Sequence, residues 1–343
     1  EQIKKYKPKY FIINDRKIFE KINIKFKKNK IKIFNNFEKV SKKEKFDITV
    51  SAIPGISGLQ PTMSMIKQSK KILIANKESI ICGWSLIKNI AKKNNTKIIP
   101  IDSEHFSIMQ LIQNYKKNEI EKIYLTASGG PFLNYNLKRF KDIKPEQAFK
   151  HPKWRMGKKI SIDSSTMMNK IFEVIEAQKI FDFPLNKIDI LIHPESLVHA
   201  IVKFKNGLTK FLYHETSMVI PIANAIFENK LIINEFYKKK KNSNLIKNLS
   251  FFKPDKSRFN ILKIKHKIIE YPSTPIILNA ANETLVSCFL QNKTSFLNIS
   301  KIIIEILSDQ NYRKYAIRTP KNINQIKTID HWARLLTLKF VQK

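Results

Sequence analysis

Three short apolar runs, separated by stretches of helical length, constrain the fold of the first hundred residues more than any other feature. The runs are F-D-I-T-V-S-A-I (46–53), K-I-L-I-A (71–75) and K-I-I-P-I (97–101). The stretches between them, 55–70 and 78–94, are each long enough for one helix. Parallel strands need a crossover connection, usually a helix, whereas antiparallel strands can be joined by a short hairpin. The pattern therefore predicts βαβ units and a parallel sheet.

Polar residues directly follow two of these runs, where an open parallel sheet binds its ligands. They are Asn76-Lys77-Glu78 and Asp102-Ser103-Glu104. Lys77 can offer a cation to a substrate oxygen or can be an ordinary solvated lysine. Asp102 and Glu104 can turn toward one hard cation, or they can stabilise the start of a helix. No G-x-G-x-x-G turn occurs in the sequence, so no phosphate-binding first unit of a dinucleotide domain is recognised in it.

The rest of the chain is patterned differently. Strands are expected at 122–127, 187–193 and 200–204, and clear helices at 278–290 and 299–307. Residues 228–253 are rich in Lys and Asn and read as a linker. This order predicts a parallel-sheet part, a central part of mixed strands and helices, and a helical C-terminal part.

The formal net charge of +36, from 64 Lys+Arg against 28 Asp+Glu, permits two interpretations. One is a nucleic-acid-binding protein, because clustered cations release counterions from phosphate backbones. The other is a compositional bias, because the basic residues are mostly Lys spread along the whole chain without an Arg-rich stripe. We favour the bias and expect no nucleic-acid partner. The charge should still attract anionic small molecules.

The cysteine content and the hydropathy of the sequence indicate the cellular compartment in which the protein is expected. Cys82 and Cys288 lie far apart, without metal-ligand spacing, which suits a reducing environment. No run reads as a secretory signal or as a membrane span. We therefore expect a cytoplasmic protein without a membrane partner.

Two loops contain residues suited to binding an anion and closing over it. In T-A-S-G-G-P-F (126–132), Ser128 and the backbone N–H groups of two glycines can hold a phosphate, although a simple turn fits as well. H-P-K-W-R-M-G-K-K (151–159) can fold over a site and exclude water, or it can be a basic surface loop with one buried Trp. His193 and His199, in L-I-H-P-E-S-L-V-H-A, are more typical of structural histidines than of catalysts.

The stretch D-S-S-T-M-M-N-K-I-F-E (163–173) resembles the start of a helix, because Asp and Ser side chains can accept hydrogen bonds from its first turn. Its Met, Ile and Phe residues fall on one face. Asn169, Glu173 and Glu176 fall on the other, with Lys170 at the edge. Periodicity alone favours a solvated polar face, but Asn169 and Glu173 are also spaced to present phosphate and metal contacts side by side.

Taken together, the motifs resemble one enzyme family over essentially the whole chain. L-I-A-N-K-E-S (73–79), P-I-D-S-E-H (100–105), S-G-G-P-F (128–132), H-P-K-W-R-M-G-K-K-I (151–160) and D-S-S-T-M-M-N-K (163–170) resemble 1-deoxy-D-xylulose 5-phosphate reductoisomerases. L-I-H-P-E-S-L-V-H (191–199) and L-N-A-A-N-E (278–283) match them too, in the same order. These are NADPH-dependent and metal-dependent enzymes of non-mevalonate isoprenoid biosynthesis that make 2-C-methyl-D-erythritol 4-phosphate.

The resemblance implies a role for each matching residue. Mg²⁺ or Mn²⁺, with Co²⁺ as a further candidate, would be held by Asp102, Glu104 and Glu173. The substrate would contact Lys77, Ser103, Glu104, Ser128, His151, Ser164, Asn169, Lys170 and Glu173. Trp154 and Met156 match a flap that closes over substrate, His199 lies close to the site, and Asn76, Glu78 and Gly157 match positions near the nicotinamide cofactor. Glu176 is left to solvent.

The resemblance also implies an architecture: an α/β protein and a homodimer. Residues 1–101 would be the remainder of an NADPH-binding Rossmann-like domain, 102–227 a catalytic α+β domain with the flap 151–159, 228–253 a linker, and 254–343 a C-terminal helical domain. The chain starts with Glu1, and the family's N-terminal strand, G-S-T-G-S-I-G loop and following unit of roughly 60 residues are not matched. We therefore expect weak NADPH binding by this chain. An inactive relative and a basic nucleic-acid-binding protein are the alternatives.

Overall fold

The computed structural model describes residues 1–40, 43–154, 156–233 and 248–342. Its first sheet has the order β3 (Phe46–Ser51), β4 (Ser69–Ile74), β5 (Lys97–Pro100), with both neighbouring pairs parallel. Helices α3 (Leu59–Ile66) and α4 (Lys77–Asn94) make the two crossovers. The predicted βαβ units are confirmed, with strand ends that shift by one or two residues.

A second, smaller parallel pair precedes this sheet and was not predicted. After α1 (Gln2–Tyr6) come β1 (Tyr10–Ile12), α2 (Arg16–Lys25) and β2 (Lys32–Phe34). β1 pairs with β2, and β3 pairs with β4, so the two sheets are separate within the described residues. An apolar cavity of about 400 Å³ lies between them, lined by residues of β1 and β3.

The central part of the chain forms a mixed sheet of order β7-β6-β8-β9. Its strands are β6 (Ile120–Ala127), β7 (Ile188–Ile192), β8 (Val198–Phe204) and β9 (Thr209–Tyr213). β6 runs parallel to β7 and antiparallel to β8, and β8 runs antiparallel to β9. α5 (Ser103–Ile112) packs on β8 and β9, and α9 (Val219–Phe227) follows the last strand. The strands expected at 122–127, 187–193 and 200–204 are confirmed.

The expected helix start at Asp163 is wrong. Helix α7 (Lys158–Thr166) already begins five residues earlier, after the short α6 (Pro145–Ala148) and the flap segment. The helix is then interrupted by Met167, whose φ of +66° is left-handed, and α8 (Met168–Phe181) follows at once. The apolar and polar residues around 167 therefore belong to two helices and do not form one continuous pair of faces.

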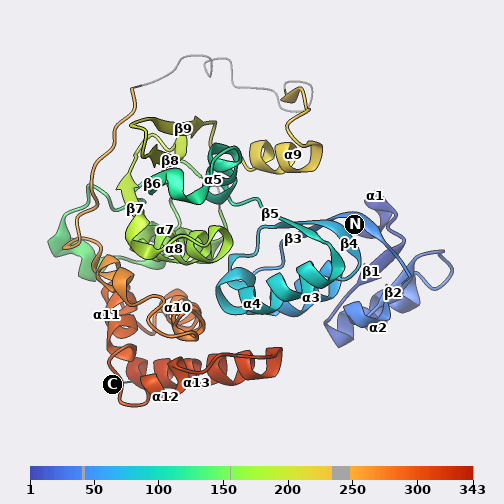
Figure 1. Cartoon of the computed structure of the whole chain (residues 1–343). Coiled ribbons are helices and arrows are strands. Elements are labelled where there is room, and N and C mark those ends of the chain that lie inside the picture. Colours follow the sequence, from blue (N-terminus) through green and yellow to red (C-terminus); the bar gives the residue numbers. More distant parts are fainter. Residues whose placement is uncertain (41–42, 155, 234–247, 343) are drawn as a thin grey trace.

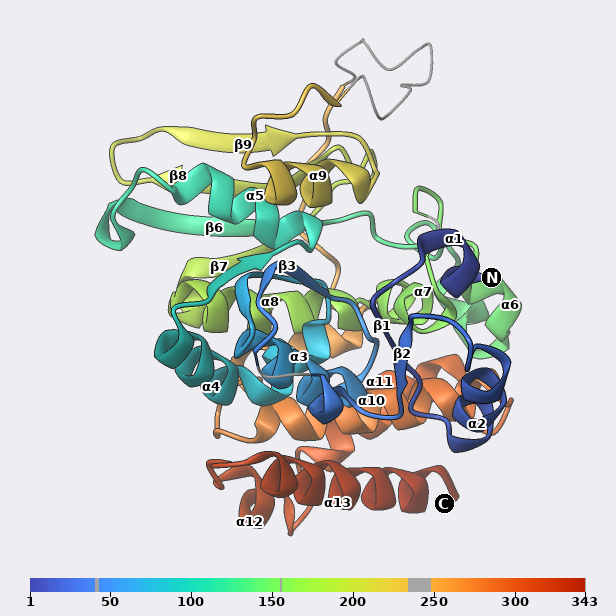
Figure 2. The same cartoon turned by 90° about the vertical axis from the view of Figure 1, so that its right-hand side faces the viewer.

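Four further α-helices follow among the described residues: α10 (Thr274–Leu290), α11 (Phe296–Ile306), α12 (Tyr312–Ala316) and α13 (Ile323–Gln342). Figure 1 shows them gathered below the central sheet, and Figure 2 shows α8 between that sheet and α10, with α13 outermost. Both helices predicted in this part are confirmed. Much of the predicted linker, residues 234–247, lies outside the described residues, and the domain boundaries stay predictions.

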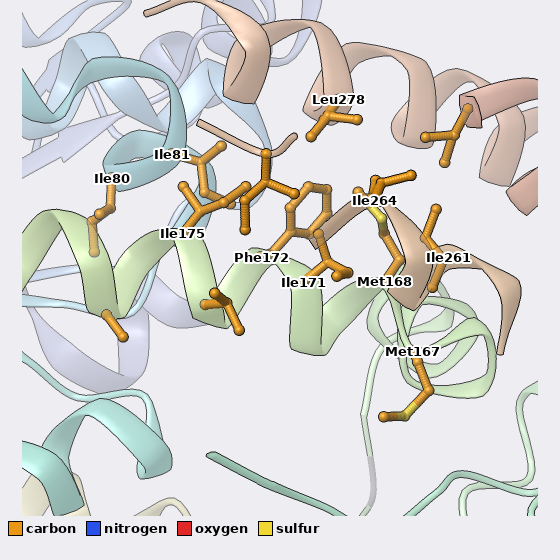
Figure 3. Close-up of a cluster of buried hydrophobic side chains, with 14 of the residues drawn as sticks. Ile80, Ile81, Met167, Met168, Ile171, Phe172, Ile175, Ile261, Ile264 and Leu278 are labelled. Carbon is orange, nitrogen blue, oxygen red and sulfur yellow. The ribbon is translucent and has the colours of Figure 1, made fainter. Parts of the chain in front are cut away.

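Helix α8 is central because its apolar face joins the core on two sides. Ile171, Phe172 and Ile175 are fully buried. Phe172 points toward the helix that carries Leu278, and Ile175 lies beside Ile81 of α4 (Figure 3). With that face fixed by packing, the opposite face of α8 is held in one orientation. In the described residues, no helix is long and apolar enough to cross a membrane.

Candidate active site

One cavity of about 270 Å³ brings together the residues predicted to bind metal and substrate, with the flap residues and His199. The predicted polar residues of its lining come from six separate stretches of the chain: Lys77, Asp102, Ser103, Glu104, Ser128, His151, Ser164, Asn169, Lys170, Glu173 and His199. Trp154 and Met156 line it as well. Asn76, Glu78 and Gly157, the predicted cofactor contacts, are not part of the lining.

The strand ends explain this convergence. Ala75 follows β4, Asp102 follows β5 and Ala127 ends β6, and all three reach the cavity. The break at Met167 turns the start of α8 toward the same place, and Met167 itself lines the cavity. The carboxyl edges of two sheets therefore meet one helix start, as expected for a ligand site in an α/β protein.

Three carboxylates form the floor of the cavity. One oxygen from each of Asp102, Glu104 and Glu173 lies within 4.8 Å of the others. Lys170 Nζ donates to Glu104 at 2.6 Å and also to Glu173, while Lys77 Nζ donates to Asp102 at 2.7 Å and to Asn169 at 2.9 Å. Two ammonium groups are thus inserted among the acids.

Burial and neighbouring charges shift the pKa values of these groups, and the shifts of Glu173 and Glu104 have opposite directions. Burial, with the neighbouring Glu104, raises the pKa of Glu173 to about 8. Burial would also raise the pKa of Glu104, but the charge of Lys170 and the hydrogen bonds from Lys170 and Ser103 hold it well below its usual range. Burial opposes the charge of Lys77, yet Asp102 and its neighbours raise its pKa well above the usual range.

Glu176 contradicts the expectation that it faces solvent. It is 1% exposed, and its Oε2 lies 3.8 Å from Lys77 Nζ and 3.9 Å from His105 Nδ1. One atom from each of Asp102, His105 and Glu176 forms a second set within 4.8 Å. Periodicity could place Glu176 on the polar face of α8, but it could not reveal that α4 and α5 cover that face.

The charges of this cluster fit a divalent cation. Asp102, Glu104, Glu173 and Glu176 supply four carboxylates, against the two ammonium groups of Lys77 and Lys170. If all six groups were ionised, the cluster would have a formal excess of two negative charges in a buried place, where such an excess is costly. Without a cation, burial raises the pKa of Glu173 to about 8 and that of Glu176 well above its usual range, which relieves part of this charge. Oxygen ligands of this kind are the ones that Mg²⁺ and Mn²⁺ prefer.

Another part of the cavity lining suits an anion. His151 Nδ1 accepts the backbone N–H of Trp154 at 2.9 Å and that of Lys153 at 3.2 Å, so its proton is on Nε2, 2.9 Å from Ser128 Oγ. Burial, with the nearby charge of Lys170, lowers the pKa of His151 to about 4, which keeps the ring neutral. Ser128 Oγ therefore accepts from His151 and from Gly130 N–H, and its own proton is free to be donated into the cavity.

His199 and Trp154 form an aromatic end of the cavity. The His199 ring stacks on His214 at 3.9 Å and meets Trp154 edge-on at 5.9 Å. Burial and His214 lower the pKa of His199 to about 3, so it is neutral as well. Ser196 and Met218 also line the cavity and were not predicted, although Ser196 stands within the motif L-I-H-P-E-S-L-V-H (191–199).

A buried network lies behind the cavity. Asn76 Nδ2 donates to the carbonyls of Ile53 and Gly55 and to Glu78, whose other oxygen pairs with Lys159 at 2.8 Å. Lys159 also pairs with Asp163 at 3.0 Å. Asp163 in turn accepts a 2.7 Å hydrogen bond from Asn282 of α10. The side chains of Asn76 and Glu78 are therefore engaged inside the protein.

Three family models match the chain. Residues 1–83 match 1-deoxy-D-xylulose 5-phosphate reductoisomerase, 98–181 its C-terminal domain, and 214–336 the DXP reductoisomerase C-terminal domain. A curated 1-deoxy-D-xylulose 5-phosphate reductoisomerase of Pelagibacter ubique (strain HTCC1062) is 47% identical over 98% of this chain and 87% of its own length. The chain belongs to the 1-deoxy-D-xylulose 5-phosphate reductoisomerase family.

Further members of the reductoisomerase family are similar to this chain in sequence and in structure. One from Wolbachia sp. subsp. Drosophila simulans (strain wRi) is 40% identical over 99% of this chain and 87% of its own length. A crystal structure of DOX-P reductoisomerase with NADPH, fosmidomycin and magnesium superposes with a TM-score of 0.87 at 30% identity, covering 99% of this chain and 88% of that one. The Zymomonas mobilis enzyme with NADPH superposes at 0.84, also at 30% identity, over 98% and 86%.

Proposed function

We propose that this chain converts 1-deoxy-D-xylulose 5-phosphate to 2-C-methyl-D-erythritol 4-phosphate, using NADPH and a divalent cation. The observation that carries the proposal is the single cavity with three carboxylates on one wall and the Ser128–His151 pair on another. That arrangement suits a small phosphorylated sugar whose two ends need different partners.

The proposed residues divide the substrate between them. Ser128, Ser164, Asn169 and Lys170, beside His151, hold the phosphate. Lys77 and Ser103 contact the sugar hydroxyls and carbonyl, and Lys77 is oriented for this by Asp102 and Asn169 at 2.7 and 2.9 Å. Asp102, Glu104 and Glu173 hold Mg²⁺, which, when bound, supplies Lewis-acid polarisation of the substrate oxygens. Trp154 and Met156 exclude water, so that the fragments of a carbon–carbon cleavage stay together until they rejoin.

The hydride comes from NADPH, for which we propose the edge of β3 and β4 near Asn76, Glu78 and Gly157. Gly55 follows β3 with a φ of +73°, and the Asn76 side chain holds its carbonyl. Calorimetric titration of the purified chain with NADPH would measure this binding.

The test of the function is magnesium-dependent oxidation of NADPH by the purified chain with 1-deoxy-D-xylulose 5-phosphate, followed by product analysis. Binding of the sugar phosphate with Mg²⁺ is measured separately, because it does not require the dinucleotide. An inactive relative would neither oxidise NADPH nor bind the sugar phosphate in a metal-dependent way. Salt-dependent binding to DNA in place of sugar-phosphate binding would favour the nucleic-acid alternative.

Finer features belong to the same proposal. Mn²⁺ or Co²⁺ would replace Mg²⁺, the protein would be cytoplasmic, and two copies would form a homodimer. The exposed apolar side chains Leu208, Phe211, Val219 and Phe227, on or beside β9 and α9, support a self-contact on that face. The domain division at 101, 227 and 253 is proposed with them.

A further inference from the structure

The Glu176 carboxylate is buried without a full set of partners. Its Oε2 accepts no hydrogen bond from the described residues, and the facing His105 Nδ1 has no partner either. Both residues are at least 99% buried. A buried carboxylate is retained at a cost unless a positive charge compensates it. Burial raises the pKa of Glu176 well above its usual range, and the ammonium of Lys77, 3.8 Å away, is the main charge that opposes this shift and favours the carboxylate form.

Two carboxylates lie closer to Lys77 than Glu176 does, but both belong to the proposed cation site. Its Nζ lies 2.7 Å from Asp102 and 3.7 Å from Glu173. Both acids belong to the set that fits a divalent cation. An oxygen that binds such a cation is a weaker acceptor for an ammonium, because the two positive charges repel each other. Glu176 is the remaining carboxylate within 4 Å of Lys77 among the described residues.

From this competition we propose that Glu176 is a positioning residue for Lys77. Its charge holds the ammonium at the cavity wall while Asp102, Glu104 and Glu173 are engaged by the cation. The inference rests on the proposed function, since it concerns how Lys77 meets the sugar phosphate. It adds a residue that does not line the cavity and acts only through its neighbour.

His105 supports this arrangement from the other side. Its Nε2 lies 3.0 Å from the Glu173 carbonyl oxygen, to which it donates, and its ring stacks on Phe181. The ring is thereby fixed behind Glu176 and prevents the carboxylate from turning away from Lys77. The competing explanation is a second cation held by Asp102, His105 and Glu176. The Lys77 ammonium already stands 2.7 and 3.8 Å from two of these groups, which favours the internal cation.

A double-mutant cycle with Glu176→Gln and Lys77→Met tests the proposal. Affinity for 1-deoxy-D-xylulose 5-phosphate in saturating Mg²⁺, and affinity for Mg²⁺ alone, are measured by calorimetry. Glu176→Gln should weaken sugar-phosphate binding about 10- to 100-fold and change Mg²⁺ affinity less than about tenfold. In the Lys77→Met background it should have no further effect. Glu176→Asp, which keeps the charge, should recover part of the loss.

Matched variants separate this role from a structural one. Glu121→Gln removes an exposed carboxylate paired with Lys203 and should leave both affinities unchanged. If Glu176→Gln does not fold, Glu176→Asp with Lys77→Met completes the cycle. The proposal would be overturned if the effects of Glu176→Gln and Lys77→Met on sugar-phosphate affinity multiplied in the double variant. A loss of that affinity in Glu176→Asp as large as in Glu176→Gln would overturn it too. A tenfold loss of Mg²⁺ affinity in Glu176→Gln would overturn it in favour of a second cation. An unaltered protein that fails to bind the sugar phosphate refutes the proposed function itself.

Discussion

Replacing Lys159 with Met should destabilise the protein through a buried junction of three parts of the chain. Lys159 lies in the first turn of α7, at the end of the predicted flap segment, and pairs with Glu78 of α4 at 2.8 Å and with Asp163 at 3.0 Å. Asp163 is also bonded to Asn282 of α10. The side chains of Glu78 and Asp163 are only 7% and 1% exposed, so neither carboxylate can be rehydrated when the ammonium is removed.

The magnitude follows from this burial. Removing one partner of a buried ion pair costs about 3–5 kcal/mol, because the other charge is left uncompensated. The Lys159 side chain is 25% exposed, so the low end applies, about 3 kcal/mol or roughly a hundredfold in the unfolding equilibrium. Burial lowers the Lys159 pKa, but Asp163 and Glu78 outweigh it and raise the pKa above 10.5. A lysine with a raised folded pKa contributes its full stabilisation below the unfolded value, so the loss should be complete at neutral pH.

The assay is thermal unfolding followed by circular dichroism, with Lys117→Met as the matched control. Lys117 and Asp182 form an ion pair whose side chains are 58% and 72% exposed, and its loss should cost under about 0.5 kcal/mol. Lys159→Met should lower the unfolding temperature by about 5 °C or more relative to that control. If the two variants unfold within about 1 °C of each other, the buried junction does not stabilise the protein as argued.

Three further predictions address the site and the core. Glu173→Gln should weaken Mg²⁺ binding at least about tenfold in calorimetry, since it removes one of three carboxylates, and unchanged affinity would count against the metal site. The ring nitrogens of His151 should show a neutral Nε2–H tautomer by NMR from about pH 5.5 to 8, because burial lowers the pKa of this histidine. Since the folded state then binds fewer protons than the unfolded state, the protein should lose stability as the pH falls below about 6.5. A titration midpoint near the usual value would contradict this. Ile171→Ala should cost about 2–5 kcal/mol in denaturant unfolding, as the side chain is fully buried, whereas a cost under about 1 kcal/mol would mean that the core relaxes around it.

The parallel sheet could be predicted because the sequence pattern that specifies each strand and each crossover helix lies within that segment of the chain. Each of β3, β4 and β5 is an apolar run followed by a helix-length segment, and the fold follows from that order. β1 and β2 have three residues each, and their side chains are only partly buried or exposed. A run that short has no measurable periodicity, so nothing in the sequence separated these strands from loops.

The break between α7 and α8 could not be predicted for a different reason. A left-handed residue within a helical pattern is usually a Gly or Asn, and here it is Met167. Met167 is 2% exposed, so tertiary packing compensates for the unfavourable backbone. Without a glycine to mark the break, the polar residues at 163–165 looked like the start of a helix instead of its last turn.

The candidate site shows what motifs alone leave out. The motifs indicated Asp102, Glu104 and Glu173 for the metal and Lys77 and Lys170 for the substrate, but they did not show that the two ammonium groups are inserted among the acids. Asp102 and Glu104 follow β5, while Glu173 and Glu176 lie on α8, so the charge balance depends on contacts between distant segments. The apolar face of α8 is locked into the core through Phe172 and its neighbours, and this prevents the acids from moving apart to relieve their repulsion. The same packing that makes the helix stable therefore keeps the carboxylates together in an arrangement that a divalent cation can neutralise.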